Sequence, residues 1–202
     1  MIHATDSKGT FYILNKKDRT PIIFIHGVGL DHSIWDLQIN AFDNTVLIYD
    51  ILGHGKTPLN KNDLSFDDFS NQILNLMDEL KFNKVHLVGF SIGSLIARNF
   101  ASRFNDRLAS LTLLCSIFNR SDKEQKIVND RFEQTKKDHK LTKDALKRWF
   151  TEDYLNKNPG ISDKIFNILQ NNNMNNFIKI YSLFVKHQDN EKFENIKTKT
   201  LV

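Results

Sequence analysis

The pentapeptide Gly89-Phe90-Ser91-Ile92-Gly93 constrains the fold of this 202-residue chain more than any other segment. It follows an apolar run, Val85 to Val88, that predicts a buried strand, and it precedes a run, Ser94 to Phe104, that predicts a helix. A sharp strand-to-helix turn leaves no room for a Cβ atom two residues before or after its centre, and glycine stands at both positions. The pattern makes Ser91 a candidate nucleophile; the alternative is a structural turn with an idle serine.

A second glycine-containing segment supports this interpretation. Residues 21–25 read as a short buried strand that ends in His26-Gly27-Val28-Gly29. Backbone amides of such a loop, together with that of Ile92, could stabilise the oxyanion that forms when a serine attacks an ester or lactone carbonyl. The candidate donors are the amides of Val28 and Ile92. We expect His26 to hold the loop by hydrogen bonds rather than to act as the catalytic base.

Strand-like and helix-like runs alternate over the first 115 residues. This alternation predicts a mostly parallel sheet with helices on both faces. Ser65 is the expected N-cap of the clearest helix. Asp67 and Asp68 would lie in its first turn, where their negative charges stabilise the positive end of the helix dipole. The expected strands are 10–14, 22–25, 45–49, 85–89 and 108–115, and the expected helices are 34–41, 66–80 and the one that ends at Phe104.

Three motifs in the same order resemble the α/β-hydrolase superfamily: the loop at residues 26–29 with Trp35 downstream, the segment Asp50-Ile51-Leu52-Gly53-His54-Gly55-Lys56-Thr57-Pro58, and the turn at Ser91. Arg148-Trp149-Phe150-Thr151, with Asn158-Pro159 after it, is similar to the cap region of 3-oxoadipate enol-lactonases. The resemblance implies an α/β-hydrolase fold in which helices flank the sheet and a helical cap is inserted. The implied divisions are a core at 1–115, a cap at 116–196 and the start of another core strand at 197–202.

The cap segment is basic. Residues 116–202 hold 17 Lys and Arg against 12 Asp and Glu, whereas residues 1–115 hold 11 against 12. A basic cap over a serine site would attract an anionic small molecule, although a solvated helical face explains most single lysines. The candidate substrate contacts are Phe90, Trp35, Arg148 and Trp149, and Arg148 is the candidate for a carboxylate. Lysines and acidic residues alternate throughout, which argues against a nucleic-acid partner.

A catalytic acid and base are missing from the expected places. In the resembling family both follow later strands, and the histidines after Ser91 are His139 and His187. His187 and Asp189 would point to different faces if they lay on one helix. We expect the sequence to be truncated at its C-terminus, with the catalytic Asp, the catalytic His and the final strand and helix missing. The 202-residue chain should then be nearly inactive and poorly soluble.

The sequence therefore predicts a serine hydrolase of small esters or lactones, with an enol-lactone of a dicarboxylic acid as the leading candidate substrate. A non-catalytic ligand-binding or inactive homologue is the alternative. No residue spacing indicates a metal site, no cofactor is expected, and no run approaches the length of a membrane span. The single cysteine, Cys115, is expected to be a buried thiol, and the expected compartment is the cytoplasm.

Overall fold

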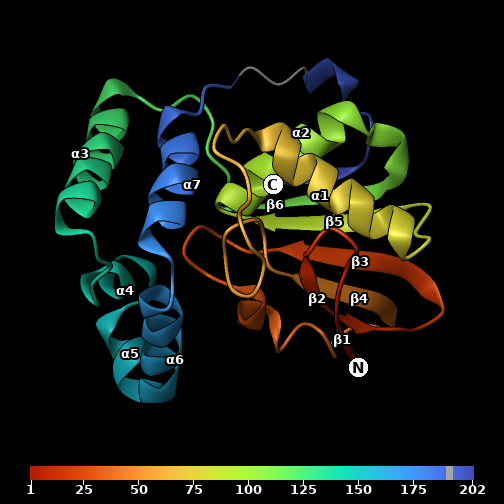
Figure 1. Cartoon of the computed structure of the whole chain (residues 1–202), viewed down its shortest axis with the longest axis horizontal. Helices are drawn as coiled ribbons and strands as arrows, with labels where there is room; N and C mark the ends of the chain where they lie inside the picture. The colour runs from red at the N-terminus through yellow and green to blue at the C-terminus, as the bar shows by residue number, and fades with distance from the viewer. Residues whose placement is uncertain (190–192) are drawn as a thin grey trace.

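The computed structural model describes residues 1–189 and 193–202. A central sheet is built from seven strands, and the helices lie in the connections between them (Figure 1). The strands are β1 (Ile2–Thr5), β2 (Phe11–Asn15), β3 (Arg19–Ile25), β4 (Asn44–Tyr49), β5 (Val85–Phe90), β6 (Leu108–Leu114) and β7 (Thr200–Leu201). The helices are η1 (His32–Trp35), α1 (Phe66–Glu79), α2 (Ile92–Arg103), η2 (Asn105–Arg107), α3 (Asp122–Asp138), α4 (Asp144–Trp149), α5 (Glu152–Lys157), α6 (Pro159–Gln170), α7 (Met174–Lys186) and η3 (Phe193–Asn195).

The sheet has the strand order β1-β2-β4-β3-β5-β6-β7. The β1–β2 and β2–β4 pairs are antiparallel, and the other four neighbouring pairs are parallel. The predicted mostly parallel sheet is thus confirmed. Strand β1 was not predicted, because its residues are mostly exposed and carry no apolar run. The carboxyl ends of β3 and β5 lie side by side, which brings the loop after Ile25 next to the turn after Phe90.

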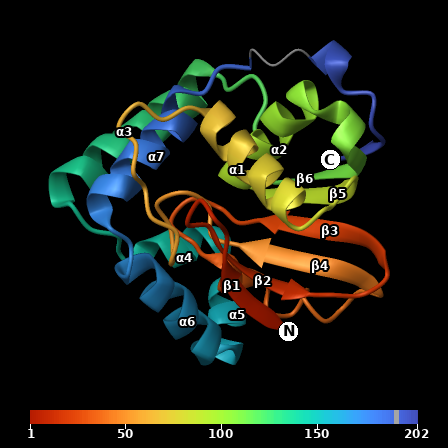
Figure 2. The ribbon, with the colours of Figure 1, turned by 45° about the vertical axis from the view of Figure 1, so that its right-hand side comes forward.

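Helices α1 and α2 cover one face of the sheet (Figure 2). Their buried residues, among them Phe69, Ile73, Ile96 and Phe100, pack against alternate residues of the strands. Alternation places every second strand residue on the same face, so one large core forms here. The predicted cap of α1 is confirmed: Ser65 and Asp68 form a capping box.

The opposite face carries a smaller core. Phe24 of β3 packs against Trp35, with ring centroids 4.9 Å apart, and Ile39 belongs to the same buried cluster. The helix expected at 34–41 is wrong in type, because a four-residue 3₁₀ helix at His32–Trp35 is followed by turns. Further along this face, residues of β3, β5 and β6 line a hollow of about 420 Å³.

Among the described residues, the helices α3 to α7 and the short η3 lie between β6 and β7 along the chain. Helices α3 and α7 run side by side, and α4, α5 and α6 gather at one end of the pair (Figures 1 and 2). Lys179 of α7 donates a hydrogen bond to Asn62 at 3.0 Å and so ties this group to the core. The predicted division of the chain at 115/116 and 196/197 stays a prediction, and residues 190–192 of the predicted cap lie outside the described residues. None of the described helices combines the length and the apolar character needed to cross a bilayer.

Candidate active site

Ser91 occupies the turn between β5 and α2 in a backbone conformation that side chains rarely adopt, with φ 56° and ψ −119°. The turn is held on both sides: the Ser91 amide donates to the Leu114 carbonyl at 2.9 Å, and the Ser94 amide donates to the Ser91 carbonyl at 2.9 Å. A Cβ atom at Gly93 would stand 2.6 Å from the Ile25 carbonyl oxygen. A Cβ atom at Gly89 would collide with the backbone of Gly93. The packing that the sequence pattern predicts is therefore present in the structure.

The loop after β3 faces this turn. A Cβ atom at Gly27 would lie 3.4 Å from the Ser91 Cβ and 3.1 Å from the Phe90 ring. The Leu30 amide donates to the Gly27 carbonyl at 3.2 Å and closes the loop. Ile92 is the first residue of α2, and first-turn amides have no acceptor within their own helix. The Val28 amide makes no hydrogen bond in the part of the chain that the structure describes.

Two buried histidines join this loop to the segment after β4. Nε2 of His26 accepts from the Ile51 amide at 3.1 Å, and its Nδ1 donates to the Gly27 carbonyl at 2.8 Å. Nε2 of His54 accepts from the Gly29 amide at 2.9 Å. Burial lowers the pKa of His26 and brings that of His54 to about 3, so both rings are neutral at pH 7. His26 thus makes the loop-holding hydrogen bonds that were expected of it.

A buried carboxylate supports the same segment. Oδ1 of Asp50 accepts from the His32 amide at 2.8 Å and from the ring Nδ1 at 2.7 Å, and Oδ2 accepts from the Lys56 amide at 2.9 Å. Burial alone would raise the pKa of Asp50, but these hydrogen bonds outweigh it and lower the pKa. Burial likewise opposes protonation of His32, yet the bond to Asp50 raises its pKa. Sequence reasoning missed this pair, although Asp50 opens the second motif.

Asp31, His32 and Asp50 bring three atoms that could ligate a metal within 4.8 Å of one another. Each of the three residues already has a role within the protein. Asp31 caps η1 by accepting from the Ser33 amide at 2.9 Å, and Asp50 binds His32. The cluster is therefore explained by a helix cap and an internal ion pair, without recourse to a cation.

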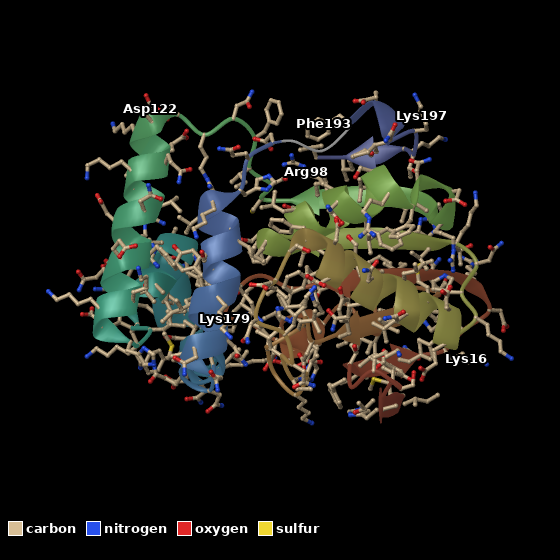
Figure 3. All side chains as sticks on the ribbon, turned by 45° about the horizontal axis from the view of Figure 1, so that its top comes forward. Lys16, Arg98, Asp122, Lys179, Phe193 and Lys197 are labelled. Carbon is tan, nitrogen blue, oxygen red and sulfur yellow. The ribbon has the colours of Figure 1, made fainter. Side chains whose placement is uncertain are left out.

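No histidine ring is hydrogen-bonded to the Ser91 hydroxyl within residues 1–189 and 193–202. His187 and Asp189 follow α7 rather than sharing one helix, so the premise that placed them on different faces was wrong, and Nε2 of His187 lies 3.4 Å from Oδ1 of Asp189. Asp189 also accepts from Arg98 at 2.5 Å. Arg98 lies two turns along α2 from Ser91, roughly 10 Å in rise. Figure 3 shows Arg98 beneath Phe193, whose ring lies 4.9 Å from its guanidinium.

Four residues had been predicted to contact substrate, and the structure separates them. Phe90 and Trp149 line one hollow of about 340 Å³ beside the turn. Trp35 is buried in the smaller core against Phe24, and the lining does not include it, so its predicted substrate contact stays a prediction. Arg148 is exposed on α4, and the lining does not include it either.

Cys115 corrects another expectation. It directly follows β6, whose last residue accepts from the Ser91 amide, so it lies close to the turn. Its thiol is exposed rather than buried, and its φ is 52°. The apolar run that suggested burial ends one residue earlier, at Leu114, which is itself 37% exposed.

Comparison with known proteins gives close parallels to this arrangement. The (E)-2-((N-methylformamido)methylene)succinate hydrolase of Acinetobacter baylyi is 27% identical over 179 residues, which cover 88% of this chain and 67% of that protein. The 3-oxoadipate enol-lactonase 1 of the same organism is 25% identical over 207 residues, covering 100% of this chain and 77% of that protein. The chain thus spans about two thirds to three quarters of the length of these relatives.

Solved structures show the same architecture. The enol-lactonase of Burkholderia xenovorans superposes with a TM-score of 0.82 at 24% identity, covering 98% of this chain and 79% of that one. A hydrolase of Pseudomonas aeruginosa gives the same TM-score at 18% identity, with 98% and 77% covered. A family model described as "alpha/beta hydrolase fold" matches residues 20–158, which include both loops and the turn at Ser91. The chain therefore belongs to the α/β-hydrolase family.

Proposed function

We propose that the protein is a serine hydrolase that cleaves a small ester or lactone, with Ser91 as its nucleophile. The observation that carries this proposal is the strained turn, which presents Ser91 between the loop at residues 27–29 and the first turn of α2. Strain of this kind costs about 1–3 kcal/mol and persists where the surrounding structure imposes it. Here the close approach of neighbouring backbone atoms to Gly89 and Gly93 holds the turn in this strained conformation.

In the proposed reaction the Ser91 oxygen forms a bond to the carbonyl carbon, and the bond from that carbon to the alcohol oxygen breaks. The Ser91 proton leaves with the alcohol. Water then cleaves the acyl-enzyme, releasing the carboxylic acid and restoring the hydroxyl. The amides of Val28 and Ile92 would donate to the oxyanion, and such a donor contributes about 3 kcal/mol of barrier lowering. The hydrolases among the similar proteins support this class of reaction.

The proton transfer needs a general base, and no described histidine is hydrogen-bonded to Ser91. The 202-residue chain alone is therefore expected to turn over very slowly. The test should use protein made from the natural reading frame, with any residues that follow Val202, beside the 202-residue chain. If neither protein hydrolyses esters although both still bind a small-molecule ester or lactone, the alternative of a non-catalytic binding protein is favoured.

The decisive variant is Ser91→Ala in the protein made from the natural reading frame, assayed with p-nitrophenyl butyrate. Its kcat/KM should fall about a thousandfold or more, because the nucleophilic oxygen is removed and the neighbouring Ser94 hydroxyl is engaged with the carbonyl of residue 91 at 2.6 Å. Ser102→Ala is a matched control on the same helix, since its hydroxyl donates only to the Asn99 carbonyl, at 3.0 Å, in the described chain. It should retain full activity. Equal activity of wild type and Ser91→Ala would overturn the proposal.

A further inference from the structure

The hollow beside Ser91 is a built pocket at the junction of the core and the helices α4 and α6. Phe90 of the turn and Leu30 of the loop form its inner part, while Trp149, Phe150, Ile161 and Ile165 approach from the helices. Its volume of about 340 Å³ lies within the roughly 300–1,000 Å³ of small-molecule sites. Ser91 itself is not part of the lining, but Phe90 directly precedes it and a Cβ atom at Gly27 would touch both residues, so the pocket adjoins the turn.

The lining is apolar except for one ion pair. Eight of its eleven residues are apolar, and the other three are Ser33, Asp36 and Lys164. Nζ of Lys164 lies 2.7 Å from Oδ2 of Asp36 and donates to the Ser33 carbonyl at 2.9 Å. Both charged side chains are about half exposed, so they stand where the pocket meets solvent. They also link α6 to the segment that follows the loop.

This pairing determines which ligand charge the pocket suits. A carboxylate that entered it would lose water and meet a lysine already neutralised by Asp36, with the Asp36 charge beside it. Burying an ionised carboxylate without a dedicated partner is strongly unfavourable, whereas an uncharged chain gains from contact with apolar walls. Arg148, the cation expected to bind substrate, does not line the pocket.

We propose that this pocket binds an uncharged, apolar acyl or alkyl group of the substrate, and that the Lys164–Asp36 pair excludes carboxylates from it. The inference rests on the proposed function, because it assigns the pocket to the ester or lactone that Ser91 attacks. A negative charge on the substrate, if there is one, lies outside this pocket.

The test measures binding rather than turnover, with two probes of equal chain length: hexanamide, which is uncharged, and hexanoate, which is anionic at pH 7. Titrations followed by protein NMR, with the Trp149 indole signal as reporter, give both dissociation constants. Wild type should bind hexanamide about tenfold more tightly than hexanoate. Binding should be the same in Ser91→Ala, so failure of the catalytic proposal would not affect this result.

Asp36→Asn then releases Lys164 from its carboxylate partner. It should tighten hexanoate binding about two- to fivefold and leave hexanamide binding unchanged, as expected for a half-exposed charge pair. Asp163→Asn is the matched control, because it breaks another exposed pair of α6, with Lys143 at 3.4 Å, outside the pocket. It should change neither constant. Equal binding of the two probes to wild type, no binding of either, or no response to Asp36→Asn would each overturn the proposal.

Discussion

The turn at Ser91 and the pocket beside it are neighbours, yet they are built in different ways. The turn and its two supporting loops are fixed by backbone contacts and by the buried side chains of His26, Asp50 and His54. The pocket is formed by side chains of helices and of an exposed segment, and its one ion pair is half exposed. The two glycines of the turn, Gly89 and Gly93, should therefore tolerate almost no substitution, while the pocket can change its lining and its specificity at little cost in stability.

The sharpest test of this contrast compares two glycines. Gly93→Ala should lower the free energy of unfolding by about 3 kcal/mol, since its Cβ would meet the Ile25 and His26 carbonyl oxygens at 2.6 and 2.7 Å. Gly160→Ala on α6 has no atom within 4 Å of its Cβ and should raise that free energy by about 0.5–1 kcal/mol. Urea titrations measure both. Equal effects of the two substitutions would remove the distinction.

Replacing the buried carboxylate should have the next largest effect. Asp50→Asn removes the charge that accepts from His32 and from the Lys56 amide, and it should cost about 2 kcal/mol. Asp36→Asn at the pocket breaks a half-exposed pair instead and should cost less than about 1 kcal/mol. The two variants are compared in the same urea titration. A larger loss for Asp36→Asn would contradict the contrast.

The pair of His32 and Asp50 should also show itself in pH dependence. The pKa of His32 is raised above 6.5, so its contribution to stability is complete below pH 6.5 and is lost as the pH rises through the folded pKa. The pKa of Asp50 is lowered, so its contribution is complete above about pH 4 and is lost on acidification through the folded pKa.

The difference in unfolding free energy between wild type and His32→Gln reports mainly on this pair, because His54 acts equally in both proteins and His32 has the smallest of the influences on the pKa of His26. Their lowered pKa values reduce stability as the pH falls below 6.5. The difference should be larger at pH 6 than at pH 9. A difference independent of pH between these values would show that the imidazole is not paired as the structure has it.

The smallest expected effect concerns strain at Ser91 itself. Ser91→Gly relieves the strain of a φ of 56°. Glycine also makes the unfolded chain more flexible, which offsets part of this gain, so the free energy of unfolding should rise by about 1 kcal/mol. Activity should be lost at the same time. A lower melting temperature for Ser91→Gly than for Ser91→Ala would show that the turn stores no strain.

Much of the fold could be predicted because local patterns carry it. Apolar runs of four to seven residues marked β2 to β6, and Ser65 with Asp68 marked the start of α1. The glycines at 89 and 93 predicted the turn, because close backbone approach excludes every other residue there. The 3₁₀ helix at His32–Trp35 was missed because it is only four residues long. Strand β1 was missed because its residues are mostly exposed and show no hydrophobic period.

The candidate site divides in the same way. The sequence by itself determined the strand–turn–helix element around Ser91 and the glycine-containing loop before Leu30, because sterics within a few residues dictate both. Only the tertiary structure decided that Asp50 binds His32, that Trp35 is buried in the core, that Cys115 is exposed, and that Lys164 pairs with Asp36 across 128 positions of sequence. Such contacts depend on how distant segments pack, and no local pattern records that packing.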